Sequence, residues 1–172
     1  MKPDSKYKIE FAALKIGDHQ FNFKADKKFF DRFNFSDFND ISVNIDIDLT
    51  KKSTLLKLNF VLEGRVNVSC DLTNEPYDHT IKHVASLVVK FGQEYNDEDD
   101  EILVLPHGEH KLFVDQYIFE MIVLSLPPKR IHPGVEDGSL NSEILEILEE
   151  LKPKENSNLA DPRWEQLKKL KK

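Results

Sequence analysis

The chain has 172 residues, of which 32% are charged and 40% hydrophobic, a composition typical of an ordinary soluble protein with one core. No apolar run approaches the ~20 residues that a membrane span requires, and the first residues lack a signal region, so we expect a cytoplasmic protein that binds no membrane. The net charge of the whole chain is −7, and its acidic excess lies in the body of the chain, between two basic ends. An acidic body argues against broad binding to nucleic-acid backbone and suits a basic protein partner.

The first forty residues predict short elements rich in phenylalanine. Residues 8–16 and 21–23 flank a Gly-Asp turn signal, so we expect them to form a hairpin. Asp26 is placed to cap a short helix that carries three phenylalanines, and a loop follows it. The aromatic side chains could form a binding surface, but we interpret them as core packing because buried phenylalanine is common.

Residues 41–49 alternate between apolar and polar side chains, which predicts a strand with one buried face. Asp46 and Asp48 lie on the polar face and could bind a metal or act as paired acids. No third ligand adjoins them, so we interpret this face as solvated. The turn at residues 50–53 predicts that the strand forms a hairpin with the next one.

The segment from Thr54 to Phe91 continues the alternating pattern and is the centre of the predicted sheet. Gly64 interrupts the first run, which predicts a bulge or a sharp bend before a second segment at residues 65–72. After a turn at residues 73–76, a third segment follows. Three antiparallel segments with one apolar face need a covering layer.

Cys70, the single cysteine of the chain, falls on the apolar side of its strand and is interpreted as a small buried hydrophobe. A nucleophile would need a histidine or a positive field beside it, which the sequence does not place. One thiolate cannot define a tetrahedral metal site. His79 and His83 share a strand face but lie ~13 Å apart. His107 and His110 flank a turn and are interpreted as ordinary loop histidines.

Residues 94–101 contain six acids in eight positions, which predicts an exposed, mobile loop because like charges repel. The alternative is a binding site for a basic partner. Short strands are expected at residues 102–105 and 111–114. Asp115 is the predicted N-cap of a helix at residues 116–126 that is apolar on most sides and therefore expected to be buried over the sheet.

The chain after Pro127-Pro128 predicts a loop, a helix and a tail. Residues 129–138 form a loop with a small basic patch, and Asn141 or Ser142 is expected to cap a helix at residues 143–151. Residues 153–160 have linker composition. Residues 161–172 predict a short amphipathic helix, below the ~12–15 residues at which an isolated helix is marginally stable in water. It must therefore dock on its own domain or on a partner. The candidate partner-binding residues are Arg163, Trp164, Lys168 and Lys169.

Three stretches in this order are similar to the YceD family, the large ribosomal RNA subunit accumulation proteins. They are the run from Gly64 to Thr73, the helix-like segment before Leu126-Pro127-Pro128, and the terminal segment 161–167. Many members carry an arginine and then a second cysteine, three residues after the first, where this chain has Leu72 and Thr73. The resemblance implies a role in making or stabilising large-subunit ribosomal RNA, and it implies no catalytic residues.

We therefore predict one α+β domain at residues 1–152 that is mostly antiparallel sheet covered by late helices, and leave open whether the sheet closes into a barrel. We find no phosphate cradle, nucleophile elbow or acid–base pair, so we expect no catalytic residues, cofactor, metal or small-molecule substrate. The predicted function is a non-enzymatic ribosome-biogenesis factor for large-subunit (23S) ribosomal RNA. Its expected partner is a basic ribosomal protein or a large-subunit RNA precursor. The alternatives are an interaction adaptor without a ribosomal role and a hydrolase or metal enzyme.

Overall fold

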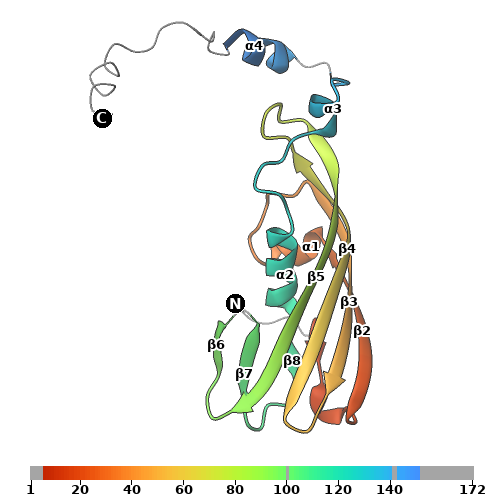
Figure 1. Ribbon diagram of the computed structural model, residues 1–172, viewed down its shortest axis with the longest axis vertical. Coiled ribbons are helices and arrows are strands. Elements are labelled where there is room, and N and C mark those ends of the chain that lie inside the picture. Colours follow the sequence, from red (N-terminus) through yellow and green to blue (C-terminus); the bar gives the residue numbers. More distant parts are fainter. Residues whose placement is uncertain (1–5, 100, 141–142, 152–172) are drawn as a thin grey trace, which may run out of the picture.

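The computed structural model describes residues 6–99, 101–140 and 143–151, and its largest element is a curved six-stranded sheet with the order β2-β3-β4-β5-β7-β6 (Figure 1). The strands are β1 (Lys8–Ile9), β2 (Gly17–Asp26), β3 (Asp40–Lys51), β4 (Leu55–Ser69), β5 (Pro76–Gly92), β6 (Asn96–Asp99), β7 (Ile102–Pro106) and β8 (Leu112–Phe113). The helices are η1 (Phe11–Ala13), α1 (Lys27–Asp31), α2 (Asp115–Leu124), α3 (Pro133–Glu136) and α4 (Glu143–Leu151). The predicted α+β class with mostly antiparallel pairing is confirmed, and in the described part of the chain the sheet is open rather than a closed barrel.

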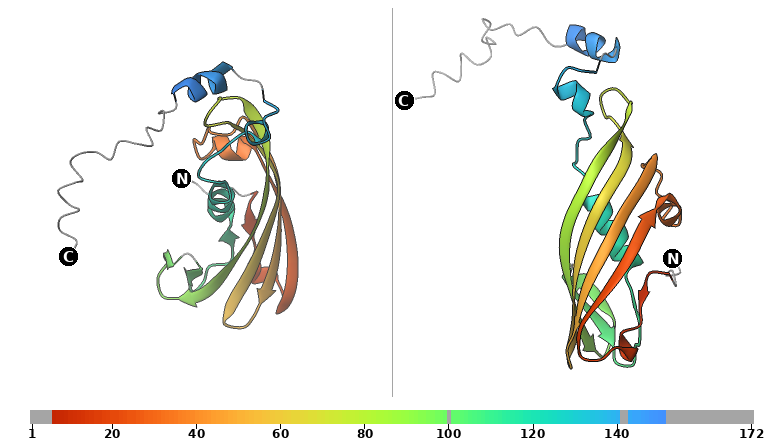
Figure 2. Two further views of the ribbon diagram at one scale, coloured as in Figure 1. Left: turned by 45° about the horizontal axis from the view of Figure 1, so that its top comes forward. Right: turned by 90° about the vertical axis from the view of Figure 1, so that its right-hand side faces the viewer.

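Strands β2 to β5 form an antiparallel meander in which each strand alternates apolar and polar side chains. Short turns join β3 to β4 and β4 to β5, whereas α1 and a loop connect β2 to β3. The inner face of β3 and β4 is fully buried and consists of Ile41, Val43, Ile45, Ile47, Leu49, Leu56, Leu58, Phe60, Leu62, Val66 and Val68. Helix α2 lies on the concave side of the sheet (Figure 2). The predicted hairpin of β3 and β4 is confirmed.

Gly64 does not interrupt β4, so the predicted bulge or bend is wrong, and residues 65–69 continue the same strand. The pairing of β4 with β3 runs through Gly64 without a register shift. A glycine is required here because the main chain of β3 lies too close for a side chain. An added Cβ would lie 2.3 Å from the carbonyl oxygen of Ser42 and 2.6 Å from the Cα of Val43. Because the buried positions stay on even numbers on both sides of Gly64, the sequence alternation itself was already continuous.

The predicted N-terminal hairpin is also wrong. The short strand β1 pairs with β8, near the start of α2, and β2 pairs with β3 instead. Between them η1 breaks the extended chain, and Gly17, with a positive φ of 133°, begins β2 rather than connecting two paired strands. The alternation in residues 8–16 is irregular for this reason.

Aromatic side chains from α1 and the loop after it pack against Phe119 in the middle of α2, as the core-packing interpretation predicts. The side chain of Asp26 accepts a hydrogen bond from the N–H of Phe29 at 3.0 Å, which confirms it as the N-cap of α1. Phe29 and Phe30 are buried. The Phe33 ring stacks on that of Phe119 in α2, with a centroid separation of 4.2 Å.

The predicted acidic loop forms part of the sheet. Residues 96–99 are β6, which pairs with β7, so the expectation of a loop is wrong for these residues. Asp115 is the first residue of α2, and Val114 holds the N-cap position that we predicted for Asp115. The helix is not buried on all sides. Ile118 and Ile122 are fully buried, whereas Leu124 is 79% exposed.

The short α3 and the amphipathic α4 follow α2 at one end of the sheet (Figure 2). The predicted helix at residues 143–151 is confirmed, and none of its side chains is buried. Its predicted caps Asn141 and Ser142, the linker at 153–160 and the tail at 161–172 lie outside the described residues. Among the described helices, none is long and apolar enough to cross a membrane.

Candidate functional site

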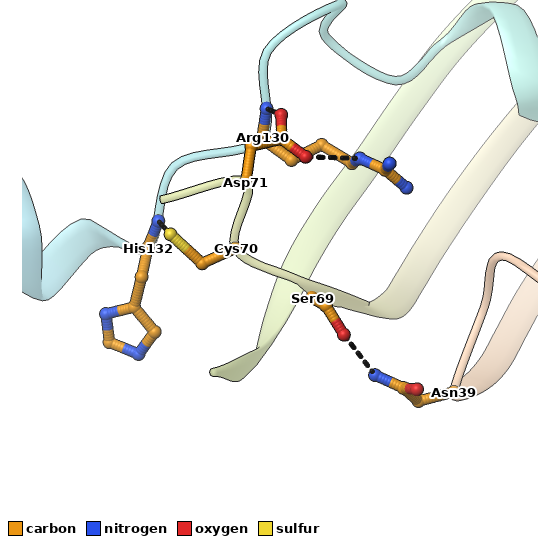
Figure 3. A network of polar contacts seen from close by, with 6 residues as sticks. All are labelled: Asn39, Ser69, Cys70, Asp71, Arg130 and His132. Atoms are coloured by element: carbon orange, nitrogen blue, oxygen red, sulfur yellow. Dashed lines mark hydrogen bonds and ion pairs between the residues drawn. The ribbon is translucent and has the colours of Figure 1, made fainter. Parts of the chain in front are cut away.

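The turn between β4 and β5 is held to the loop before α3 by three polar contacts, which we call the Asp71–Arg130 clasp (Figure 3). The main-chain N–H of Asp71 donates to the carbonyl oxygen of Arg130 at 2.8 Å. The main-chain N–H of Arg130 donates to the Asp71 carboxylate at 2.7 Å, and the guanidinium Nε lies 3.6 Å from the same carboxylate. The clasp therefore joins two segments that are 59 residues apart in the sequence.

Cys70 lies next to the clasp and is buried, as the strand pattern predicts. Its environment is nevertheless polar, because the main-chain N–H of His132 donates to the sulfur at 3.3 Å. Burial opposes ionisation of the thiol. Hydrogen bonds from the Thr73 hydroxyl and from the main-chain N–H groups of His132, Thr73 and Leu72 outweigh burial and lower the pKa of Cys70 below its ordinary value.

The His132 ring is not placed to activate Cys70. Figure 3 shows the imidazole turned away from the sulfur. Its Nδ1 accepts a hydrogen bond from the N–H of Gly134 at 2.9 Å, and the ring packs edge-on against Tyr77 at a centroid separation of 5.4 Å. The ring thus has a structural role as the N-cap of α3. A cysteine–histidine pair for nucleophilic catalysis is not formed here.

Thr73 occupies the position of the second cysteine in the paired-cysteine pattern, and its hydroxyl forms a hydrogen bond with the Cys70 thiol. The turn is closed by Asn74, which has a positive φ of 58° and donates its N–H to the carbonyl oxygen of Cys70 at 2.8 Å. The residue three positions after Cys70 therefore supplies a hydroxyl that lowers the pKa of the thiol. Among the described residues, no three His, Cys, Asp or Glu side chains gather closely enough to hold a metal ion.

The clasp continues into a polar rim at this end of the sheet. The Asn39 side chain donates to Ser69 at 3.4 Å (Figure 3). It also donates to Asn67 at 3.1 Å. Asn67 in turn donates to Asp78 at 2.7 Å. These contacts tie the loop before β3 to the β4–β5 hairpin close to its tip.

The other candidate residues do not join the clasp. Asp46 and Asp48 accept cross-strand hydrogen bonds from Asn22 and Gln20 on the outer face of the sheet, which confirms the interpretation of a polar, exposed face. His79 and His83 lie on the same face of β5, and His107 and His110 are exposed. The candidate partner-binding residues Arg163, Trp164, Lys168 and Lys169 lie outside the described residues.

Sequence reasoning missed a groove of about 1180 Å³ between α2, β5 and the β6–β7 hairpin. Tyr95 and Tyr117 line it, and burial of Tyr117 beside Tyr95 and Asp97 raises the pKa of its phenol above the ordinary value. The groove depends on the parallel pairing of β7 with β5. No local sequence pattern predicts this pairing, because β5 and β7 are separated in the chain by the acidic segment that contains β6.

Comparison with protein families gives one finding. A family model described as large ribosomal RNA subunit accumulation protein YceD matches residues 58–171. The matched span begins within β4 and includes β5, α2 and both sides of the Asp71–Arg130 clasp. Comparison with curated proteins and with solved structures finds no significant match.

Proposed function

We propose that this chain, which belongs to the YceD family of large ribosomal RNA subunit accumulation proteins, supports the synthesis, processing or stability of large-subunit (23S) ribosomal RNA. The observation that carries the proposal is the family match over residues 58–171, which is about two thirds of the chain. The family name supports a role in large-subunit RNA accumulation. The step at which this chain acts is our inference.

The role that we propose is binding rather than catalysis. The Cys70 thiol is engaged by donors, the His132 ring caps α3, and the Asp71 carboxylate is engaged by Arg130. The YceD family is not known as an enzyme family. Each polar group of the site thus has a structural partner, and this supports a function carried by surfaces.

We further propose that the partner is a basic ribosomal protein or a large-subunit RNA precursor, and that the tail at residues 161–172 contacts it. The tail holds five Lys or Arg residues against two acids. Trp164 supplies a large apolar anchor, and Arg163 with Lys168 and Lys169 supplies charge for acidic protein or phosphate. The matched family span reaches into this tail, which supports a shared use of it.

Sedimentation of low-salt cell extract on a sucrose gradient tests the proposal. We expect the protein to migrate with large-subunit precursors and to leave them when residues 160–172 are deleted. A chain that migrates only with proteins unrelated to the ribosome would favour the alternative, an interaction adaptor. The control is thermal unfolding of the deletion variant, because a lower melting temperature would assign the tail a structural role instead.

A further inference from the structure

One part of the sheet edge has no strand beside it. Strand β7 pairs with β5 only from Val88 to Gly92, while β4 pairs with β5 along its whole length. On the side away from β4, residues 80–86 of β5 pair with no other strand in the described part of the chain. An unpaired strand edge is a ready template for another extended chain.

The backbone direction along this edge follows from one hydrogen bond. The N–H of Val88 donates to the carbonyl oxygen of Glu101, on the β7 side, at 2.8 Å. Because N–H and C=O of one residue point to the same side of a strand and alternate with period two, the same groups of Lys82, Val84 and Ser86 also point outward. An added strand would continue the row that β7 begins.

The groove described above lies along this edge. Its wall includes residues 83–86 of β5 on one side and, among the α2 residues on the other, the apolar Met121 and Leu124. Tyr95 and Leu124, which line the groove, are 55% and 79% exposed, so the described residues leave these two large apolar side chains uncovered.

The charge of the groove specifies what it would accept. Six acidic side chains line it against one lysine, Lys111. Asp97, Asp99 and Glu101 lie on the β6–β7 hairpin at the end of the free edge, where the side chains of an added strand would pass. Negative charge disfavours nucleic acid and also a second copy of this acidic chain.

We propose that the free edge of β5 binds an extended, basic segment of a partner protein by strand addition, with basic side chains directed at the β6–β7 acids and apolar ones at α2. The chain's own basic tail is a poorer fit, because Trp164, Leu167 and Leu170 recur at helical spacing rather than with period two. This inference does not depend on the ribosomal role.

The test uses the full-length protein and labelled twelve-residue peptides, measured by fluorescence anisotropy. The probe alternates lysine with valine, and a glutamate–valine peptide is its charge control. Two further analogues carry N-methyl groups on every second residue, one on the lysines and one on the valines, because only one of these two sets of N–H groups can face β5. We expect the lysine peptide to bind, one methylated analogue to bind at least about tenfold more weakly, and the glutamate peptide not to bind.

Matched variants locate the site. Val84→Pro removes one outward N–H and leaves the hydrogen bonds between β5 and β4 in place. Proline is tolerated on an edge strand where the N–H points away from the sheet. It should weaken binding about tenfold, whereas Val84→Thr should bind like the wild type. The double variant Asp99→Asn/Glu101→Gln should weaken binding several-fold and flatten its salt dependence, while Asp40→Asn/Glu63→Gln, which removes the same charge elsewhere, should not.

Several results would overturn the proposal. One is equal binding by both methylated analogues and the parent peptide, and another is unchanged binding by the Val84→Pro protein, whose folding is checked by its melting temperature. If Val84→Pro lowers the melting temperature, the test is instead the change in backbone amide NMR shifts of the wild-type protein when the lysine peptide is added. No change in the shifts of residues 80–86 would contradict strand addition. Binding that appears only after removal of residues 161–172 would show that the chain's own tail fills the groove.

Discussion

Asp71 and Arg130 bind each other through both main chain and side chain, with the two N–H···O hydrogen bonds at 2.8 and 2.7 Å. This reciprocal contact fixes the tip of the β4–β5 hairpin against the segment that leads from α2 to α3. Both residues lie within the span matched by the family model. The relationship therefore links the β4–β5 hairpin to the helical end of the chain within the span that the family model matches.

Removing the carboxylate of Asp71 should destabilise the protein. In Asp71→Ala the N–H of Arg130 loses its acceptor, and we expect the free energy of unfolding to fall by about 1 kcal/mol. The ion pair adds little, because its side chains are 36% and 29% exposed. Asp71→Asn keeps an acceptor oxygen and should lose less than half as much. Urea unfolding measures both variants, and equal losses would contradict this account of the clasp.

The hydrogen-bonded thiol of Cys70 predicts a pH dependence of stability. Because the pKa of Cys70 is lower in the folded protein than in the unfolded chain, the ionised thiolate favours folding. This contribution is absent below the folded pKa, grows as pH rises through it, and is complete above the ordinary thiol pKa of ~8.5. The wild type should therefore gain stability relative to Cys70→Ser as the pH rises. The difference between their free energies of unfolding should increase from pH 7 to about pH 9.5.

The size of this effect depends on Thr73, whose hydroxyl is the largest contribution that lowers the pKa of Cys70. Thr73→Val removes the hydroxyl at similar volume, so thiolate absorbance at 240 nm should appear at higher pH than in the wild type. Cys70→Ser itself should lower stability modestly at pH 7. A wild-type-minus-serine difference that stays constant with pH would show that the donors around the sulfur do not favour the thiolate.

Gly64 is predicted to tolerate no side chain. An added Cβ would meet main-chain atoms of Ser42 and Val43, which cannot move without disrupting the β3–β4 ladder. Gly64→Ala should therefore lower the unfolding free energy by about 1–3 kcal/mol, in the range of overpacked sites. The neighbouring exposed Glu63→Ala is the control and should change stability by less than about 0.5 kcal/mol. Stability losses of equal size for Gly64→Ala and Glu63→Ala, measured by thermal unfolding, would refute the steric explanation.

The sequence predicts the parts of this fold that depend on local pattern. The alternation in residues 41–49 and 54–91 predicts β3, β4 and β5, and Asp26 predicts the start of α1, since both signals act within a few residues. The pairings of β1 with β8 and of β7 with β5 join distant segments and leave no periodic signal. The acidic residues 96–99 form β6 because pairing with β7 overrides their low strand propensity.

The candidate site shows the same division. Burial of Cys70 follows from its place beside Val66 and Val68 on the inner face of the sheet. Its donors do not follow, because His132 is 62 residues away in sequence. The clasp and the groove both arise where the last third of the chain returns to the sheet, a step that is specified by tertiary packing rather than by any local motif.

The most direct test of the proposed role is the molar ratio of large-subunit to small-subunit ribosomal RNA in host cells depleted of this protein. We predict that the ratio falls on depletion, that precursors of the large-subunit RNA change in amount, and that the wild-type chain restores both, as does the surface control Glu63→Gln. A ratio that stays at its normal value, in cells where loss of the protein has been verified, would contradict the central claim.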